Sequence, residues 1–395
     1  MNNKNLMDYE SIEKILGFED PFNIEPSISR ELRFKSLKAS FEHHYLNNKV
    51  YKGFCELANV SPADIKNYED LVLIPLVPSD FFRDVSATGR HEDLVHISSV
   101  PDEQIARYFT TSGTGGQPSI YPYDGRSLGT INRSNAIIFK KVGGLKSDDY
   151  MLFLTPSTDK ADTGMVQGMY LTMKGIFKDT DSQLDFAIQD NIFDTKSIVN
   201  KLTKAKGRTR HLYGPPYAYN QLCEQMSNLG LEMRLDPESK AITTGGWKSF
   251  KDEAISPSEL KEKIQKAFGI APQEIRDGLG LTDIMSILVE CQYGNKHVPP
   301  WIEVSIRDLN DPSWKTDVAI GKDGLIAFLD PLISSFPAYI VTGDVGKLTI
   351  SQDEKCSCGR YGATIEYVRR AGDPRGCALR QEQLMTEVES KRKTK

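Results

Sequence analysis

The chain has 395 residues, with 49 basic and 54 acidic side chains and a formal net charge of −5. This balance argues against a dedicated nucleic-acid-binding protein, which would carry a basic stripe. With 39% hydrophobic and 26% charged residues, the chain has the composition of a globular protein large enough for two or three domains.

The start of the chain and its cysteine content bear on localisation. The first ten residues contain no apolar signal-peptide core, and six cysteines without such a signal favour a reducing compartment. The longest apolar run, Leu71 to Val77, is broken by Pro75 and is too short to cross a bilayer, so a buried strand is its simplest interpretation. We therefore expect a cytoplasmic protein without a membrane span.

The order of the predicted elements indicates an α/β protein. Apolar residues recur at helical spacing over 28–47, which predicts one long amphipathic helix. From about residue 104, short apolar runs alternate with helical patterns, as in a largely parallel sheet covered by helices. After about residue 300, short strands between Pro and Gly turns predict a smaller β-rich lobe. The expected strands are 150–154, 184–188, 211–213, 241–243, 274–277, 302–307, 324–329, 338–342 and 346–350, and the expected helices are 194–205, 215–229 and 256–268.

The helix over 256–268 has the clearest end signals. Ser256 is a plausible N-cap, Pro257 stands at the first helical position, and Glu259 can complete a capping box. Gly269 suits the C-cap. The face formed by Leu260, Ile264 and Phe268 should be buried.

A glycine- and hydroxyl-rich loop follows the partly apolar segment from Ile105 to Phe109. Its small side chains allow a tight turn that brings several N–H groups and hydroxyls onto one phosphate. No Gly-Lys-[Ser/Thr] follows at the spacing of the nucleotidase phosphate loop. Taken alone, an ordinary surface turn explains the loop as well as a phosphate site does. Its residues are Thr111, Ser112, Gly113, Thr114, Gly115 and Gly116.

Four further segments carry glycine or charge where strands should end. The strand from Ala241 ends in the pair Gly245-Gly246, and ligands approach α/β sheets at such carboxyl ends. Thr282 and Asp283 follow another glycine-bearing strand exit, where they could bond a phosphate and hold Mg²⁺. Asp344 follows a strand and could accept both ribose hydroxyls. The last segment is the basic pair Arg369-Arg370 before a turn at Asp373.

Taken in order, these motifs resemble the signatures of adenylate-forming enzymes over roughly residues 70–380. Within that superfamily, Cys356-Ser-Cys-Gly-Arg360 is similar to the phenylacetate-CoA ligase branch. The segment Ile74 to Phe81 and the sequence Gly376-Cys-Ala-Leu379 look most like the acyl-protein synthetases of the bacterial bioluminescence fatty-acid reductase complex. The motifs are Thr111 to Pro118, Gly245-Gly246, Gly280-Leu-Thr-Asp283, Thr342-Gly-Asp344 and Arg370-x-x-Asp373.

The resemblance implies a fold and an ATP site. The fold would be the α/β large domain of an adenylate-forming enzyme with a truncated C-terminal lobe. Its parts would be a helical region over 1–100, a nucleotide- and acyl-binding core over 101–300, a β-rich lobe over 301–368 and a C-terminal segment over 369–395.

Individual roles also follow from the resemblance. Residues 112–116, together with Thr111, would wrap the ATP phosphates, and Gly245 and Gly246 would line the cleft for adenine and the acyl-adenylate. Thr282 would contact the α-phosphate, Asp283 would hold Mg²⁺, and Asp344 and Arg370 would fix the ribose. The substrate-binding residues are predicted to be Tyr213 and Gly214 at one strand exit and Trp247 after the glycine pair.

The chain departs from the superfamily pattern in three places. Ser119 follows Pro118 where a lysine is usual, and Lys248 or Arg126 are the candidate replacements. Leu279 stands where an aromatic residue commonly stacks on adenine. Only 22 residues follow Asp373, so the usual C-terminal lobe and its catalytic lysine are expected to be absent.

Cys377 is the predicted acyl acceptor. Four arginines lie within eight positions of it, and nearby cations favour the thiolate nucleophile. The resemblance implies that a carboxylic acid, expected to be a fatty acid, is activated with ATP and Mg²⁺, transferred to Cys377 and passed to an acyl-CoA-reductase-like partner. Two alternatives stay open: an acyl- or aryl-CoA ligase, and a non-catalytic nucleotide-binding subunit of an assembly.

For the remaining cysteines and for His211, a structural role is favoured over a functional one. Cys356 and Cys358 could bind zinc, but no second cysteine pair or nearby histidine completes a site in the sequence, and a tight turn is favoured. Cys291 is most simply a core residue. His211 could line the acyl pocket, although a buried histidine with satisfied hydrogen bonds is favoured.

Overall fold

The computed structural model describes residues 9–79, 81–82, 97–110, 119–158, 164–189, 192–281 and 283–371, without the side chains of 164, 165, 248, 249 and 251. The chain forms two compact units. The first unit takes Met1–Ile131, Thr282–Met285 and His297–Lys395, and the second takes Asn132–Leu281 and Ser286–Lys296.

A seven-stranded sheet is the centre of the second unit. Its four inner pairings, from β9 to β5, are parallel, and β10 and β6 add antiparallel strands at the two edges. This is the parallel sheet that the alternating pattern predicts. In spatial order the strands are β10 (Ile287–Val289), β9 (Ile275–Gly280), β8 (Ala241–Thr244), β7 (Arg210–Gly214), β4 (Tyr150–Pro156), β5 (Leu184–Gln189) and β6 (Ile192–Phe193).

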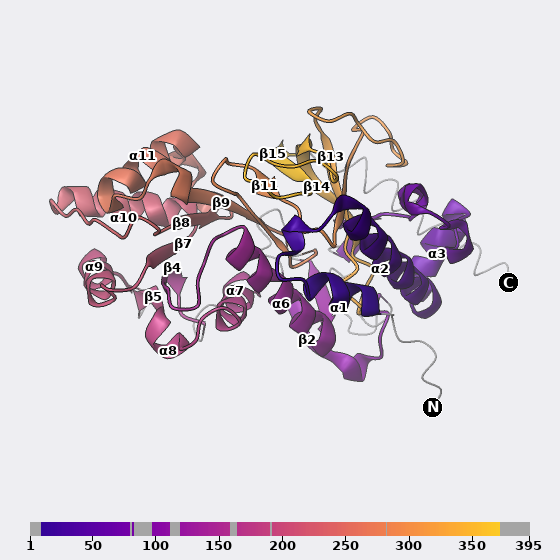
Figure 1. The fold of residues 1–395 in the computed structure, drawn as a ribbon, viewed down its shortest axis with the longest axis horizontal. Helices are drawn as coiled ribbons and strands as arrows, with labels where there is room; N and C mark the ends of the chain where they lie inside the picture. Colours follow the sequence, from indigo (N-terminus) through magenta and orange to yellow (C-terminus); the bar gives the residue numbers. More distant parts are fainter. Residues whose placement is uncertain are drawn as a thin grey trace. The chain divides into compact units, whose positions relative to one another are not determined.

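Helices cover both faces of this sheet (Figure 1). On one face, Leu152 and Leu212 share a buried core with apolar side chains of α9 (Thr195–Lys204), α10 (Pro216–Asn228) and α11 (Pro257–Phe268). On the other face, Tyr213 contacts Phe139 of α6 (Gly125–Lys141). There, α7 (Gly164–Lys174) brings Tyr170 against Phe186, and the short α8 (Thr180–Gln183) precedes β5.

The N-cap residue, the first-position proline and the C-cap glycine predicted for α11 are confirmed in the structure. The Ser256 hydroxyl accepts a hydrogen bond from the Glu259 N–H at 3.2 Å, and Pro257 is the first helical residue. Gly269 ends the helix at a φ of +69°, a conformation that favours glycine. Leu260, Ile264 and Phe268 are buried as predicted.

The first unit contains a six-stranded sheet and a two-stranded ladder. One predicted detail is wrong: the strands expected at 338–342 and 346–350 form the single strand β14. The glycines inside β14 do not end the strand, because its pairing with β15 continues past two shifts of register. The sheet order is β11 (Lys296–His297), β15 (Thr364–Arg370), β14 (Tyr339–Ile350), β13 (Gly324–Leu329) and β12 (Glu303–Arg307), with β1 (Val77–Pro78) beside β14; β2 (Ile105–Thr110) and β3 (Ile120–Asp124) form the ladder.

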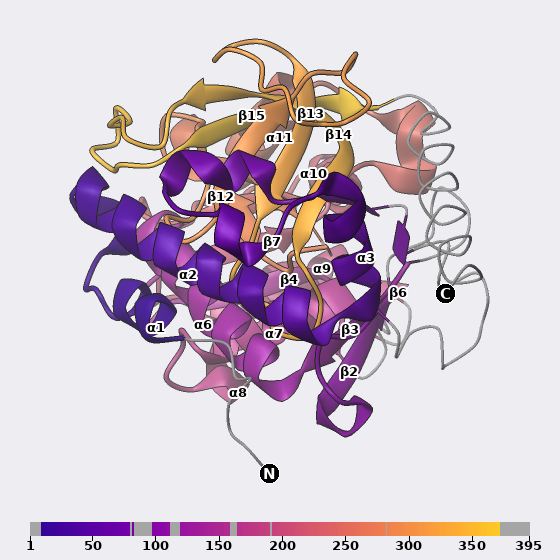
Figure 2. The same cartoon turned by 90° about the vertical axis from the view of Figure 1, so that its right-hand side faces the viewer.

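The long helix α2 (Pro26–Asn47) lies across this six-stranded sheet (Figure 2). In the first half of the helix, Arg33 pairs with Glu303 of β12 at 2.8 Å. In the second half, the Tyr339 hydroxyl of β14 donates to Ser40 at 2.7 Å. The helix is flanked by α1 (Glu10–Leu16) and α3 (Lys49–Ala58).

The apolar run from Leu71 to Val77 is not the buried strand that its composition predicts. Asn67 caps a 3-10 helix that continues to Leu73, and only Val77 and Pro78 join a sheet. Leu73 is 36% exposed, so the run is not uniformly buried. The 3-10 helices are η1 (Pro21–Asn23), η2 (Pro62–Asp64), η3 (Tyr68–Leu73), η4 (Asp102–Gln104), η5 (Lys248–Glu253) and η6 (Pro272–Glu274).

Among the described residues, no helix combines the length and the apolar character that a membrane crossing needs.

Candidate active site

The glycine-rich loop joins two strands that pair with each other. Thr110 at the end of β2 is the register partner of Ile120 at the start of β3. Residues 111–118 lie outside the described residues, and so does Thr282. The structure thus fixes both ends of the predicted phosphate loop, on one antiparallel ladder.

Asp283, the predicted Mg²⁺ ligand, is held by the strand that leaves this loop. The hydroxyl of Tyr121 on β3 donates a hydrogen bond to the Asp283 carboxylate. Tyr121 is buried against the rings of Phe82 and Phe336. Burial, reinforced by the negative charge of Asp283, raises the pKa of Tyr121 well above its ordinary value, so the phenol keeps its proton and remains a donor. The sequence analysis missed Tyr121, because nothing in the local pattern separates it from other core aromatics.

Asp344 and Arg370 form an ion pair in the first unit. They are register partners on β14 and β15, and Arg370 Nη1 lies 3.2 Å from Asp344 Oδ1. The Asp344 side chain is 8% exposed and that of Arg370 is 74% exposed. Burial raises the pKa of Asp344, and the Arg370 charge opposes this shift. The pair presents a shielded hydrogen-bond acceptor beside an accessible cation.

The glycine pair of the second unit follows directly on β8. Gly245 has a φ of +71°, so the turn here favours glycine. Among the described residues, a Cβ added at Gly245 or Gly246 would meet no atom within 4 Å. Packing therefore does not require the small size of Gly246. Both glycines are exposed and Trp247 is half-buried.

Two buried hydroxyls lie at neighbouring strand ends beside this turn. Tyr213 is the last residue but one of β7 and Thr244 is the last residue of β8, and these strands are adjacent and parallel. Within the described part of the chain, neither Tyr213 Oη nor Thr244 Oγ1 has a hydrogen-bond partner. Burial raises the pKa of Tyr213, with the nearby Thr244 hydroxyl opposing the shift. A buried hydroxyl without a hydrogen bond costs free energy, and a ligand that pairs with it removes this cost. This edge of the sheet therefore offers two polar groups to a ligand.

Gly214 has a packing reason of its own. A Cβ at this position would lie 2.7 Å from Leu154 Cβ on β4, closer than real side chains approach. The contact between β4 and β7 therefore requires glycine, whether or not substrate also lies here.

A buried cation that the sequence analysis missed contacts two carboxylates of the second unit. Lys296 Nζ contacts Asp277 Oδ2 at 3.0 Å and Glu290 Oε1 at 2.9 Å. Although burial opposes it, the two carboxylates raise the pKa of Lys296. Lys296 is thus engaged with carboxylates of its own unit.

Arg126 and Lys248 are the predicted replacements for the missing loop cation. The Arg126 guanidinium lies 3.2 Å from the centroid of the Tyr9 ring, and the side chain of Lys248 is outside the description. Cys377 and Asp373 also lie outside the described residues.

His211 is a satisfied buried histidine, as the sequence analysis favoured. Its Nε2 lies 2.8 Å from Asp149 Oδ2, and its Nδ1 accepts from the Lys240 N–H at 3.1 Å. Both ring nitrogens are therefore engaged inside the protein.

Comparison with known proteins identifies relatives over nearly the whole chain. The family model described as acyl-protein synthetase, LuxE, matches residues 1–386. A protein of Vibrio harveyi named long-chain-fatty-acid–luciferin-component ligase is 28% identical over 366 residues, which are 90% of this chain and 89% of that relative. The protein of the same name from Aliivibrio fischeri is 26% identical over 356 residues, 89% of this chain and 88% of that relative.

A solved structure shares the fold. A crystal structure of an open conformation of 2-hydroxyisobutyryl-CoA ligase superposes with a TM-score of 0.68 at 18% identity, covering 89% of this chain and 77% of the other. This likeness confirms the predicted fold class, an α/β adenylate-forming domain.

Proposed function

The chain belongs to the acyl-protein synthetase (LuxE) family of acyl-activating ligases, and from this premise we propose that it activates a long-chain fatty acid with Mg-ATP and carries the acyl group on Cys377. The two relatives named long-chain-fatty-acid–luciferin-component ligase support the class of acid. By the same likeness, the acyl group then passes to a partner reductase.

The contact between Tyr121 and Asp283 is the observation that carries the ATP site. Tyr121 lies on β3, which follows the glycine-rich loop directly. A phosphate loop and a metal-binding carboxylate must be neighbours to act on one nucleotide, and this contact ties Asp283 to the strand that leaves the loop. Asp344 and Arg370 offer the acceptor and cation that a ribose site needs.

The residues present fit a magnesium ion. Mg²⁺ binds through one or two protein carboxylates together with phosphate oxygens and water. Asp283 supplies such a carboxylate, and the Tyr121 hydroxyl orients it. Bound there, Mg²⁺ would neutralise charge on the ATP phosphates.

The proposed chemistry has two covalent steps. The carboxylate of the fatty acid attacks the α-phosphorus of ATP, and the bond between this phosphorus and the oxygen that bridges to the β-phosphate breaks. Pyrophosphate departs, and the product is an acyl-adenylate. The Cys377 thiolate then attacks the acyl carbon and AMP leaves, which gives a thioester. N–H donors of residues 111–116 would stabilise the charge that builds on the phosphates.

Retention of a labelled acyl group on the denatured chain tests this proposal. Incubation with radiolabelled fatty acid and Mg-ATP should leave base-labile label on the wild-type chain, and Cys377→Ser should lose it. Cys223→Ser is the matched control, because burial raises the pKa of that thiol to about 12 and leaves it unreactive. Efficient acyl-CoA formation that Cys377→Ser does not affect would instead assign a CoA ligase.

A further inference from the structure

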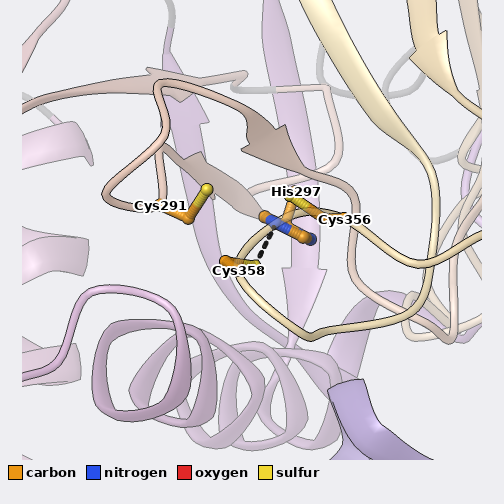
Figure 3. A group of neighbouring side chains, drawn as sticks. All are labelled: Cys291, His297, Cys356 and Cys358. Carbon is orange, nitrogen blue, oxygen red and sulfur yellow. Dashed lines mark hydrogen bonds between the residues drawn. The ribbon is translucent and has the colours of Figure 1, made fainter.

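Four side chains of types that bind metals lie close to one another. One ligand atom from each of Cys291, His297, Cys356 and Cys358 can be chosen so that all four lie within 4.8 Å of one another. Figure 3 shows them gathered from two segments, with the Cys358 sulfur 3.3 Å from His297 Nε2. The sequence analysis assigned Cys291 to the core and found no partner for the Cys356–Cys358 pair.

The first segment is a short hairpin that carries Cys291 and His297. The Cys291 N–H donates to the Asn295 carbonyl at 2.9 Å, and the Gly294 N–H donates to the Cys291 carbonyl at 3.0 Å. Gly294 takes a φ of +75°, which allows the tight turn. Five intervening residues thus return the chain so that both side chains reach one place.

The second segment is a tight turn that carries the two remaining cysteines. The Cys356 N–H donates to the Arg360 carbonyl at 2.8 Å, and the Gly359 N–H donates to the Cys356 carbonyl at 2.8 Å. Gly359 takes a φ of +90°. The turn therefore presents two thiols separated by a single residue to the hairpin.

The group is buried and includes an unsatisfied nitrogen. His297 is 0% exposed, and its Nδ1 has no hydrogen-bond partner within the described part of the chain. The ring of Phe22 covers it edge-on at 6.1 Å between centroids. An imidazole nitrogen left unpaired in such a buried place costs free energy.

The thiol chemistry suits a metal ion. Cysteine sulfur and histidine nitrogen are the ligand atoms that structural zinc sites use. Zinc takes four ligands at about 2.3 Å for sulfur and 2.0 Å for nitrogen, which places tetrahedral ligand atoms about 3.5 to 3.8 Å apart. The four ligand atoms, all within 4.8 Å of one another, exceed that range by about 1 Å at most.

We propose that Cys291, His297, Cys356 and Cys358 bind one structural Zn²⁺ ion. Three thiolates and an imidazole form a closed set of four, which leaves no position for a substrate. The ion would fasten the hairpin at 291–297 to the turn at 356–360, which leads into β15 and so to Arg370. Soft thiolate ligands favour Zn²⁺ over the hard Mg²⁺ proposed at Asp283.

Metal analysis of the full chain tests this proposal. Protein expressed with added zinc salt and purified without chelator should contain about one zinc per chain by mass spectrometry. Cys358→Ser and Cys291→Ser should reduce this at least tenfold. Cys55→Ser is the matched control, because Cys55 is a buried thiol of α3 outside the group, and it should keep the full amount.

Cobalt reconstitution of the wild-type chain avoids dependence on the variants folding. Co²⁺ bound at this site should show thiolate charge-transfer absorption and the strong visible bands of a tetrahedral complex. Zinc should displace these bands stoichiometrically. Wild-type protein without zinc and without the cobalt spectrum would overturn the proposal, as would zinc retained equally in both cysteine variants.

Discussion

At the scale of single residues, the charged groups of the candidate site are held by partners distant in sequence. Tyr121 lies 162 positions before Asp283 and donates to it, and the aromatic rings of Phe82 and Phe336 fix the phenol. No spacing rule predicts such a pair, since both residues have ordinary local contexts. The roles of Asp283, Asp344 and Arg370 came from the order of motifs and stay predictions.

Tyr121→Phe isolates this contact. The ring keeps its packing, and only the hydrogen bond to the carboxylate is lost, which is worth about 1.5–3 kcal/mol to a charged acceptor. We expect the KM for Mg-ATP to rise about 10- to 100-fold, with little loss of stability. Tyr123→Phe, a change in the same aromatic cluster, is the control. A KM unchanged in Tyr121→Phe would remove Tyr121 from the site.

Two buried histidines predict an acid-sensitive fold. Burial lowers the pKa of His44 and His211 below 6.5, although Asp149 opposes the shift at His211. Just below pH 6.5 the unfolded chain therefore binds more protons than the folded chain does. The contribution of the two neutral histidines to the free energy of unfolding is complete above that pH and is lost as the pH falls.

Urea unfolding across that window measures the effect. The free energy of unfolding should fall by at most about 1.4 kcal/mol per pH unit for each histidine. His211→Gln should make the dependence shallower. A stability that is constant from about pH 7 to 5.5 would contradict the account.

At the scale of elements, sequence rules worked where local signals decide the structure. The cap residues of α11 and the alternation of strands and helices in the second unit were predictable, because each rests on hydrogen bonds or burial within a short segment. The structure of the run from Leu71 to Val77 was not predictable from its apolar composition, because the Asn67 cap and Pro75 outweigh that composition. The unbroken β14 also escaped prediction, because its pairing with β13 and β15 carries it past its glycines.

Two glycines at strand exits should respond differently to alanine. Gly214→Ala places a methyl group 2.7 Å from Leu154 Cβ, so we expect a loss of about 1–3 kcal/mol in the free energy of unfolding. Gly246→Ala meets no described atom, so its stability should change by less than about 0.5 kcal/mol while acyl-adenylate formation falls. Denaturant unfolding and an adenylation assay on both variants make the comparison. Full activity in Gly246→Ala would place the ligand elsewhere.

At the scale of the whole molecule, five short motifs in a fixed order predicted the family, and the match over residues 1–386 confirms it. The proposed zinc ligands could not be predicted in this way. His297 and Cys356 are far apart in sequence, and only the fold brings the hairpin and the turn together. Order along the chain thus predicted the chemistry that relatives share, whereas tertiary contacts were needed for the rest.

Acid-dependent exchange of pyrophosphate into ATP is the most direct test of acyl-adenylate formation. In a panel of fatty acids of increasing chain length, some should drive exchange in the wild-type chain. The control variant is Asp323→Ala, which alters an exposed carboxylate before β13 and should keep this exchange. Asp344→Ala should lose most of this exchange. The absence of exchange with every acid would contradict catalysis, and unaltered exchange in Asp344→Ala would contradict the ribose assignment.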